Sequence, residues 1–333
     1  MRRQLAIGVG AAVCLATGLV GVLPPAQAAG PGIHVSNGRL VERNGTDLVL
    51  RGINHAHTWY TSQTGSFAGI KAAGANSVRV VLSNGVRWTK NSASDVTGVI
   101  NLCTTNKLIC VLEVHDTTGY GEQSGATTLA KAADYWVELK KVLAGQEDHV
   151  LINIGNEPYG NNGYQTWATD TSAAIKKIRD AGLAHTIVVD APNWGQDWSF
   201  TMRDNAPAVL AADPTGNTMF SIHMYGVFDT AAEVKAYLDA FTSKKLPIMV
   251  GEFGNQHSDG DPDENTIMSY TASQRLGMMG WSWSGNSSDV GYLDMVNNFQ
   301  ASSLTSWGAR FIDGANGLRT GTKEATIYGG VQP

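Results

Sequence analysis

Two glutamates stand at the ends of short apolar runs and could act together as a pair of carboxylates. Residues 150–154 indicate a buried strand that stops at Glu157 and Pro158, because proline cannot donate to a sheet ladder. Residues 248–250 lead into Glu252 in the same way. Catalytic acids occupy such strand ends in parallel α/β barrels, and paired carboxylates cleave glycosidic bonds. For either glutamate alone, the alternative is a loop residue that only accepts a backbone hydrogen bond.

Other strand ends also carry polar or aromatic side chains that are unusual in a core. Taken singly, Arg79 could belong to a buried ion pair, and His223 could be a satisfied core histidine. Burying many such groups costs several kcal/mol unless they pair with one another or with a ligand. We therefore expect one functional site that collects them. Besides the two glutamates, its predicted members are Arg79, His115, Asn156, His223, Tyr225 and Trp281.

The order of the predicted elements places these strand ends around one mouth. A hairpin with two Asn-Gly turns comes first, and apolar runs then alternate with helical stretches such as 128–143, 164–181 and 231–242. This order predicts an α/β protein, a (β/α)8 TIM barrel with a short N-terminal β-hairpin. A doubly wound open sheet is the alternative, but no glycine-rich phosphate turn follows the first strand. The predicted strands are 48–54, 77–83, 109–116, 150–157, 186–191, 219–225, 247–253 and 277–283.

The residue types suit hydrolysis of a glycosidic bond with retention. In that reaction one ionised carboxylate attacks the anomeric carbon, and a protonated one about 5 Å away gives its proton to the leaving oxygen. An arginine and a tyrosine beside Glu252 would keep it charged, and its charge would hold the proton on Glu157. Asn156 can hydrogen-bond the sugar 2-hydroxyl, and a tryptophan face can stack on a sugar ring.

The set of motifs resembles glycoside hydrolase family 5, whose members are retaining (β/α)8 barrels. The motifs are Arg79, His115, Asn156-Glu157-Pro158, His223-x-Tyr225, Gly251-Glu252-Phe253 and Trp281. The resemblance runs from the hairpin to about Tyr328. The segments RGINHAHTWY, VLEVHDTTGYGE and GWSWSGN resemble more narrowly the bacterial β-mannanases of that family, especially those of actinomycetes.

The resemblance implies roles for the residues of the site. Glu157 would be the acid/base and Glu252 the nucleophile, flanked by Arg79 and Tyr225. The cleaved sugar would be lined by Asn156, His115, His223 and Trp281, with Trp283 as the competing platform. Four tryptophans in predicted loops could bind further sugars or could anchor the loops: Trp59, Trp88, Trp194 and Trp198.

The resemblance also implies a substrate. We expect a retaining endo-β-1,4-mannanase that needs no cofactor and acts on mannan, galactomannan and glucomannan. An endo-β-1,4-glucanase is the first alternative, since residues at the cleaved bond distinguish C2 epimers poorly. A non-catalytic carbohydrate-binding barrel is the second, although a pure binder has no need of both glutamates.

Composition agrees with a neutral polymer as the partner. The chain has 333 residues, 43% apolar and 16% charged, enough for one large domain. The net charge of −5 argues against nucleic acid. We expect a monomer whose partner is a β-mannan polysaccharide.

The N-terminus predicts a signal peptide over residues 1–28. Arg2 and Arg3 precede an apolar stretch over residues 5–23, and Ala-Gln-Ala at 26–28 is a cleavage site. A membrane anchor is the alternative, but a polar chain follows and no later stretch could span a bilayer. We expect a secreted, extracellular protein with one catalytic domain over residues 29–333 and no membrane attachment after cleavage.

Two cysteines remain after the predicted cleavage, which removes Cys14. An oxidising compartment and an even count favour a disulfide between Cys103 and Cys110. Two buried thiols are the alternative.

An acidic loop follows the seventh predicted strand and carries Asp259, Asp261, Asp263 and Glu264. Oxygen-rich loops of this kind can bind a structural Ca²⁺ ion, although no glutamate stands at the twelfth position of an EF-hand loop. The alternative is a solvated loop that caps the next helix.

Overall fold

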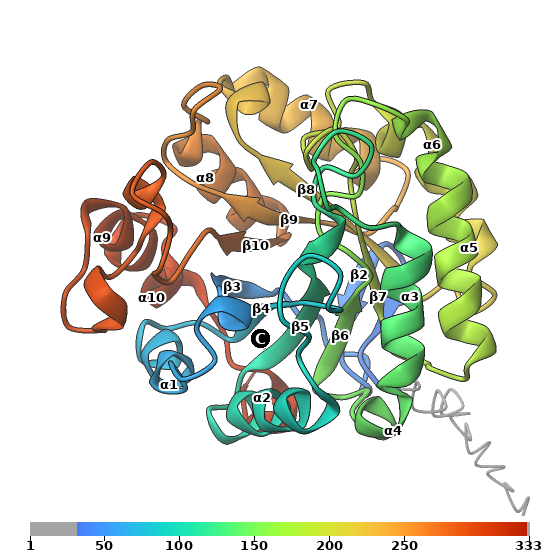
Figure 1. Cartoon of the computed structure of the whole chain (residues 1–333). Coiled ribbons are helices and arrows are strands. Elements are labelled where there is room, and N and C mark those ends of the chain that lie inside the picture. Colours follow the sequence, from blue (N-terminus) through green and yellow to red (C-terminus); the bar gives the residue numbers. More distant parts are fainter. Residues whose placement is uncertain (1–31, 332–333) are drawn as a thin grey trace, which may run out of the picture.

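Eight parallel strands close into a barrel in the computed structural model, which describes residues 32–331 (Figure 1). The strand order around the barrel is β10-β3-β4-β5-β6-β7-β8-β9, so consecutive strands are neighbours. This confirms the predicted (β/α)8 barrel. The strands are β3 (Arg51–His55), β4 (Ser77–Leu82), β5 (Ile109–Val114), β6 (Val150–Asn153), β7 (Ile187–Asp190), β8 (Thr218–Met224), β9 (Ile248–Phe253) and β10 (Gly277–Gly280).

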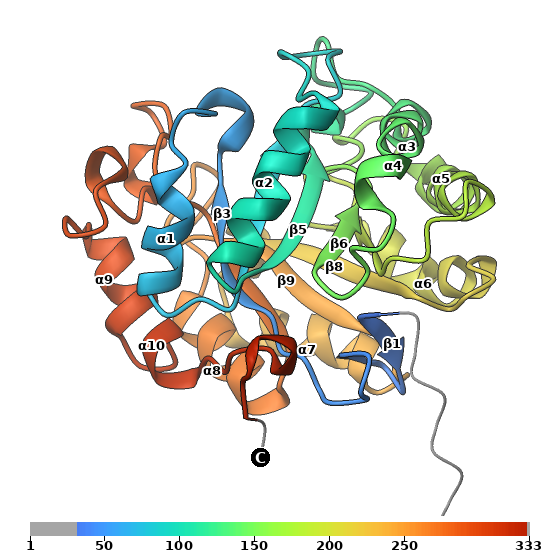
Figure 2. The same cartoon turned by 90° about the horizontal axis from the view of Figure 1, so that it is seen from below.

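The helices lie around the outside of the barrel (Figures 1 and 2). The stretch predicted as one helix over 128–143 is broken at Leu139 into two. The α-helices are α1 (Gly65–Ala72), α2 (Ala93–Thr105), α3 (Leu129–Glu138), α4 (Lys140–Leu143), α5 (Trp167–Asp180), α6 (Thr201–Ala212), α7 (Ala231–Thr242), α8 (Glu264–Gln274), α9 (Ser306–Asp313) and α10 (Leu318–Gly321).

The predicted hairpin is formed by β1 (His34–Ser36) and β2 (Arg39–Val41), which pair antiparallel. Leu48 N–H donates to the carbonyl of Leu40, so residues predicted to open the first barrel strand extend the hairpin instead. For this reason β3 begins three residues later than predicted. The hairpin and the C-terminal segment lie at the same end of the barrel (Figure 2).

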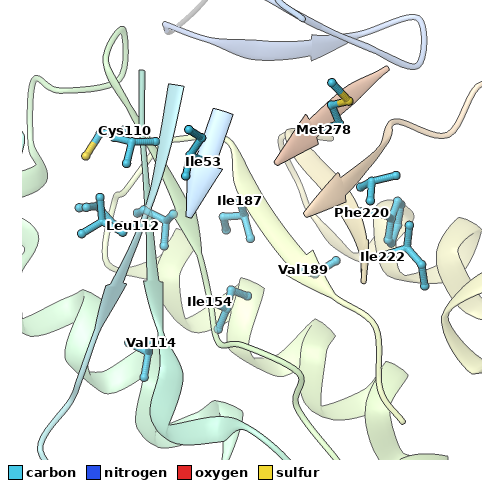
Figure 3. Packing of buried hydrophobic residues seen from close by; sticks show 14 of the residues in the cluster. Ile53, Cys110, Leu112, Val114, Ile154, Ile187, Val189, Phe220, Ile222 and Met278 are labelled. Carbon is cyan, nitrogen blue, oxygen red and sulfur yellow. The ribbon is translucent and has the colours of Figure 1, made fainter. Parts of the chain in front are cut away.

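Side chains alternate between the inside of the barrel and the layer under the helices, as the period of a strand requires. In β5, Ile109 and Val111 pack inside with residues of the other strands. Cys110, Leu112 and Val114 belong to the larger cluster between strands and helices (Figure 3). Both clusters are almost fully buried, so the apolar core supports every strand whose end carries a site residue.

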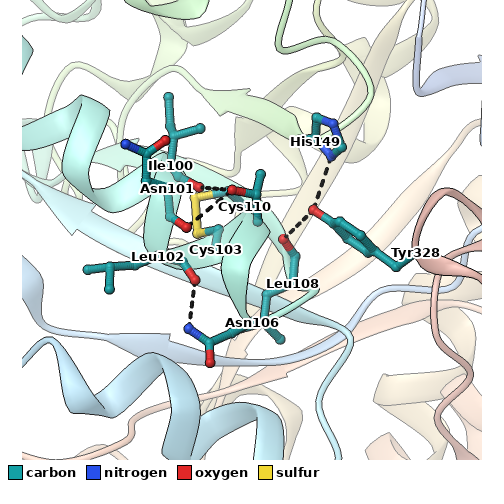
Figure 4. Close-up of a disulfide and its surroundings, with 10 residues drawn as sticks. Ile100, Asn101, Leu102, Cys103, Asn106, Leu108, Cys110, His149 and Tyr328 are labelled. Atoms are coloured by element: carbon teal, nitrogen blue, oxygen red, sulfur yellow. Dashed lines mark hydrogen bonds between the residues drawn. A yellow bond between two sulfur atoms is a disulfide. The ribbon is translucent and has the colours of Figure 1, made fainter.

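A disulfide joins Cys103 of α2 to Cys110 of β5 (Figure 4). Because Cys110 faces the helix layer, the bond ties α2 to the barrel. Two residues before Cys110, the carbonyl of Leu108 accepts a hydrogen bond from Tyr328 OH over 3.2 Å (Figure 4).

Within residues 32–331, no helix is long and apolar enough to cross a membrane. The predicted signal peptide and Cys14 lie outside the described residues.

Candidate active site

Glu157 and Glu252 meet at the carboxyl ends of the strands. Glu157 follows β6, and Glu252 lies near the end of β9. One oxygen of each lies within 4.8 Å of the other and of a ring nitrogen of His223. Both are nearly buried, with Glu157 9% and Glu252 4% exposed. Glu157 has φ 39°, a region that non-glycine residues rarely occupy and that is found at functional sites.

Arg79 organises the buried polar groups around this pair. It is 1% exposed and lies inside the barrel on β4. Burial lowers its pKa, but three buried carboxylates raise it above the ordinary arginine value, so it stays charged. Its guanidinium donates to Glu252 Oε1 (2.6 Å), Asn54 Oδ1 (2.9 Å), Asn153 Oδ1 (2.8 Å), Asn156 Oδ1 (2.7 Å) and Asp190 Oδ2 (3.0 Å).

Glu252 accepts hydrogen bonds on both oxygens. Arg79 donates to Oε1, and Tyr225 OH donates to Oε2 over 3.1 Å. Burial raises the pKa of Glu252, while the charges of His223 and Arg79 oppose that rise. Burial and the charge of Glu252 raise the pKa of Tyr225 well above 10, so the phenol stays a neutral donor.

His223 bridges the two glutamates and a third carboxylate. Its Nδ1 lies 2.8 Å from Glu157 Oε1 and 3.6 Å from Glu252 Oε2, and its Nε2 lies 3.3 Å from Asp190 Oδ2. Burial lowers the pKa of His223, but Glu252 and Asp190 outweigh it and raise the pKa to about 10. Burial raises the pKa of Asp190, but His223 and Arg79 lower it to about 2. The two groups therefore form an imidazolium–carboxylate pair beside Glu157.

An aromatic wall stands on one side of the pair. His115 stacks on Trp281 with ring centroids 5.7 Å apart and an interplanar angle of 21°. The ring centroids of Trp59 and Trp88 lie 5.3 and 5.7 Å from that of His115. Glu113 accepts a hydrogen bond from His115 Nδ1 at 2.9 Å and, with burial opposing, raises the pKa of His115. The wall offers ring faces to a sugar.

A cavity of about 310 Å³ opens on the other side, and Glu157 and Tyr225 line it. Trp194 and Trp198 lie along it, and Trp198 is 47% exposed. Trp198 Nε1 donates to Asn161 Oδ1, which fixes the ring at the edge of the cavity. Of the four tryptophans predicted to bind sugars or to anchor loops, Trp59 and Trp88 thus belong to the aromatic wall, and Trp194 and Trp198 line the cavity.

The expected competition between Trp281 and Trp283 for one platform is wrong. The strand β10 ends at Gly280, so the two tryptophans do not share a strand face. Trp283 is 1% exposed and lies against Gly69 of α1, where an added Cβ would approach its ring to 2.6 Å. It is a core residue.

Some residues of the site were not predicted. Asp190 and Asn153 end β7 and β6, and Glu113 lies on β5, all inside the barrel beside Arg79. Asp190 nearly ends its predicted strand, so the signal that found Glu157 applies to it. Asn153 and Glu113 lie three or four residues before the predicted strand ends, and only their inward direction could have indicated them. His257 stacks on Tyr225 with centroids 4.4 Å apart, and no strand pattern could have indicated this loop residue.

The acidic loop does not gather its carboxylates. Asp263 caps α8 by accepting from Thr266 N–H, which matches the alternative prediction. Asp259 accepts from Gln196 Nε2 and Gly226 N–H instead. Within residues 32–331, the one cluster of three metal-ligating side chains is Glu157, His223 and Glu252.

A parallel barrel with two carboxyl groups at this spacing in its mouth defines a retaining glycoside hydrolase. Residues 41–287 match the family model described as Cellulase (glycosyl hydrolase family 5). The chain belongs to glycosyl hydrolase family 5.

Similar proteins cover most of the chain. A mannan endo-1,4-β-mannosidase of Streptomyces lividans is 61% identical over 306 residues, 92% of this chain and 80% of that protein. A mannan endo-1,4-β-mannosidase of Cellvibrio japonicus is 47% identical, covering 93% and 73%. The structure of a β-mannanase from Thermomonospora fusca superposes with a TM-score of 0.88 at 61% identity, covering 89% of this chain and 99% of that one.

Proposed function

We propose that this chain is a retaining endo-β-1,4-mannanase that cleaves mannan, galactomannan and glucomannan by double displacement. The observation that carries the proposal is the approach of Glu157 and Glu252 to within 4.8 Å, since retaining enzymes hold their carboxyl groups about 5 Å apart. The mannan substrate is supported by the 61% identity to a mannan endo-1,4-β-mannosidase. A complex of the Thermomonospora fusca β-mannanase with mannohexaose, at 60% identity, supports it too.

In the first step Glu252 attacks the anomeric carbon while Glu157 protonates the leaving oxygen. The bond from carbon to the leaving oxygen breaks as the bond to Glu252 forms, and the proton of Glu157 goes to the leaving sugar. Arg79 and Tyr225 hold Glu252 ionised and oriented. Glu252 has these two donors, whereas within residues 32–331 no arginine or tyrosine donates a hydrogen bond to Glu157, which contacts His223.

In the second step Glu157 removes a proton from water, and the resulting nucleophile displaces Glu252. His223 donates Nδ1–H to Glu157 Oε1, which stabilises Glu157 once it is ionised after the first step. Asp190 Oδ2 lies 3.3 Å from the other ring nitrogen, so its charge keeps His223 an imidazolium while Glu157 changes charge.

Azide rescue separates the two roles. We expect Glu157→Ala to form the glycosyl-enzyme from an aryl mannoside with a very acidic phenol, because such a group departs without a proton. The second step is then slow, and added azide restores turnover and yields the β-azide. We expect Glu252→Ala to lose activity on every substrate. A β-azide from Glu252→Ala together with an α-azide from Glu157→Ala would reverse the assignment.

Substrate choice is tested by reducing-sugar release from mannan and from carboxymethylcellulose side by side. We expect the rate on mannan to exceed that on carboxymethylcellulose by at least about tenfold. A faster rate on carboxymethylcellulose would make the chain a glucanase on the same machinery.

We also propose that the protein is secreted after cleavage near residue 28, on the basis of the N-terminal composition. N-terminal sequencing of exported protein should begin at Ala29 or within two residues of it. Exported protein that retains Met1 would contradict this.

A further inference from the structure

A cavity of about 380 Å³ lies at the end of the barrel opposite the catalytic glutamates. Its lining residues come from the start of β3, from the end of α8 and from the segment around α10. Its lining includes three basic side chains and no acidic one among the described residues. The polar lining residues are Arg51, Arg275, Asn316, Thr320 and Lys323.

Arg51 brings a buried positive charge to this cavity without a counter-ion. It is 2% exposed, and no carboxylate of residues 32–331 forms an ion pair with it. Its Nη2 donates only to backbone carbonyls, those of Asn316 and Gly317. Its Nε is buried and has no hydrogen-bond partner within that part of the chain. Burial lowers its pKa to about 10, and no acidic neighbour opposes this.

Two other arginines with buried side chains have the carboxylate partner that Arg51 lacks. Arg79 contacts Glu252 and Asp190 at 2.6 and 3.0 Å. Arg179, with a side chain 4% exposed, pairs with Asp213 at 2.9 Å. A buried charge without a partner is costly. Among the described residues, Arg79 and Arg179 have a carboxylate partner and Arg51 faces a cavity instead, which leaves room for an external anion.

Two of the three basic side chains lie at the rim of the cavity, and the acidic side chains near the rim are paired with basic ones. Lys323 is exposed and forms no ion pair among the described residues. Arg275 is also exposed, and its Nη2 contacts Asp47 at 3.0 Å. The neighbouring Glu324 is held by Lys71 at 2.9 Å. The cavity is therefore lined by three positive side chains, of which Arg275 is paired with Asp47.

We propose that this cavity binds a small inorganic oxyanion, sulfate or phosphate, on Arg51 with Arg275 and Lys323 at its rim. A guanidinium presents several N–H donors in a planar fork that matches such oxygens. Asn316 and Thr320 supply polar atoms around the remainder of the ion. Bound anion stabilises the folded chain by mass action, because the unfolded chain has no such site. The site lies at the far end of the barrel from Glu157 and Glu252, so it acts on stability and not on the chemical step.

The test is a thermal-unfolding titration with sodium sulfate at constant ionic strength, with chloride replaced in steps up to about 20 mM sulfate. We expect a saturable rise in melting temperature for the wild type and a matching binding isotherm by calorimetry. The rim variant Arg275→Gln/Lys323→Gln should bind at least about five-fold more weakly, since two surface charges near the ion are lost. The matched control is Lys131→Gln, an exposed lysine on α3 outside the cavity, which should titrate like the wild type.

Sulfate also stabilises proteins generally by exclusion from their surface, so the comparison between variants decides the result. An equal shift in all three proteins, or a shift that does not saturate, would overturn the site. Arg51→Met, checked for folding by circular dichroism, should lose the saturable response; retention of it would also overturn the assignment. Initial rates on mannan should not change with sulfate in any variant, so the outcome is independent of the proposed activity.

Discussion

Replacing Tyr225 by phenylalanine removes one hydroxyl from the site and keeps the ring. The hydroxyl donates to Glu252 Oε2 over 3.1 Å, and the raised pKa of Tyr225 keeps it neutral at every working pH. A hydrogen bond to a charged group contributes about 1.5–3 kcal/mol. Since the bond stabilises only the ionised form of Glu252, its loss should move the acid limb of the kcat/KM profile upward by about one to two pH units, at 1.36 kcal/mol per unit.

The assay is kcat/KM on an aryl mannoside and on soluble mannan from about pH 4 to pH 9. Below the displaced limb, we expect Tyr225→Phe to be about 10- to 100-fold slower than the wild type. Above the displaced limb, the kcat/KM values of Tyr225→Phe and the wild type should approach each other, because Glu252 is ionised in both proteins. A purely structural effect would lower the rate by the same factor at every pH.

The chain offers a matched control in Tyr237→Phe. Tyr237 is also a buried tyrosine whose hydroxyl donates to a carboxylate, Asp197 Oδ2 at 2.6 Å, but it lies on α7 outside the site. We expect this variant to lose stability and to keep the acid limb of the wild type. An unmoved limb in Tyr225→Phe, or the same displacement in Tyr237→Phe, would refute the reasoning.

Three further predictions concern stability. Burial lowers the pKa of His55 to about 3 in the folded chain, so between about pH 6.5 and pH 3 the unfolded chain binds one more proton than the folded chain. The free energy of unfolding should therefore be highest above about pH 6.5 and fall by up to about 1.4 kcal/mol per pH unit towards pH 3. Urea midpoints across pH should show this slope, and His55→Met should flatten it. Free-thiol titration of denatured, unreduced mature protein should find neither Cys103 nor Cys110, and reduction should cost roughly 2–3 kcal/mol at most; two free thiols would contradict the disulfide. Because Asp263 caps α8 and Asp259 binds Gln196, chelator and added Ca²⁺ should both leave the melting temperature unchanged, and a calcium-dependent rise would restore the cation hypothesis.

Much of the fold could be predicted because strands and helices in this barrel have different hydrophobic periods. The eight strands were placed correctly in order, and the errors lie at their ends. Residues 48–50 are apolar enough for a barrel strand, yet Leu48 pairs with the hairpin. Leu139 interrupts a helix whose pattern continues through it. Both differences depend on which partner the backbone finds, and local composition does not specify that partner.

The structure places the predicted residues of the site together because buried polar side chains at strand ends are costly. Arg79, Asn156 and His223 lie in contact with the glutamates or with one another. The same argument, applied to every inward position, would also have indicated Asp190 and Asn153. The burial of Trp283 in the core could not be predicted in this way, because its position depends on the path of the chain after β10 ends.

The orientation of Glu252 depends on a β-bulge. Met249 packs inside the barrel, so strict alternation along β9 would place Glu252 under the helices. The pairing of β8 with β9 runs from Ile222 opposite Val250 to His223 opposite Glu252, which leaves Gly251 as an extra residue. That extra residue restores Glu252 to the inner face beside His223. Glycine is required there, since a Cβ at Gly251 would lie 2.1 Å from Ser221 Oγ. Alternation alone therefore predicts the wrong face for Glu252, and the glycine immediately before it is the local sign of the β-bulge.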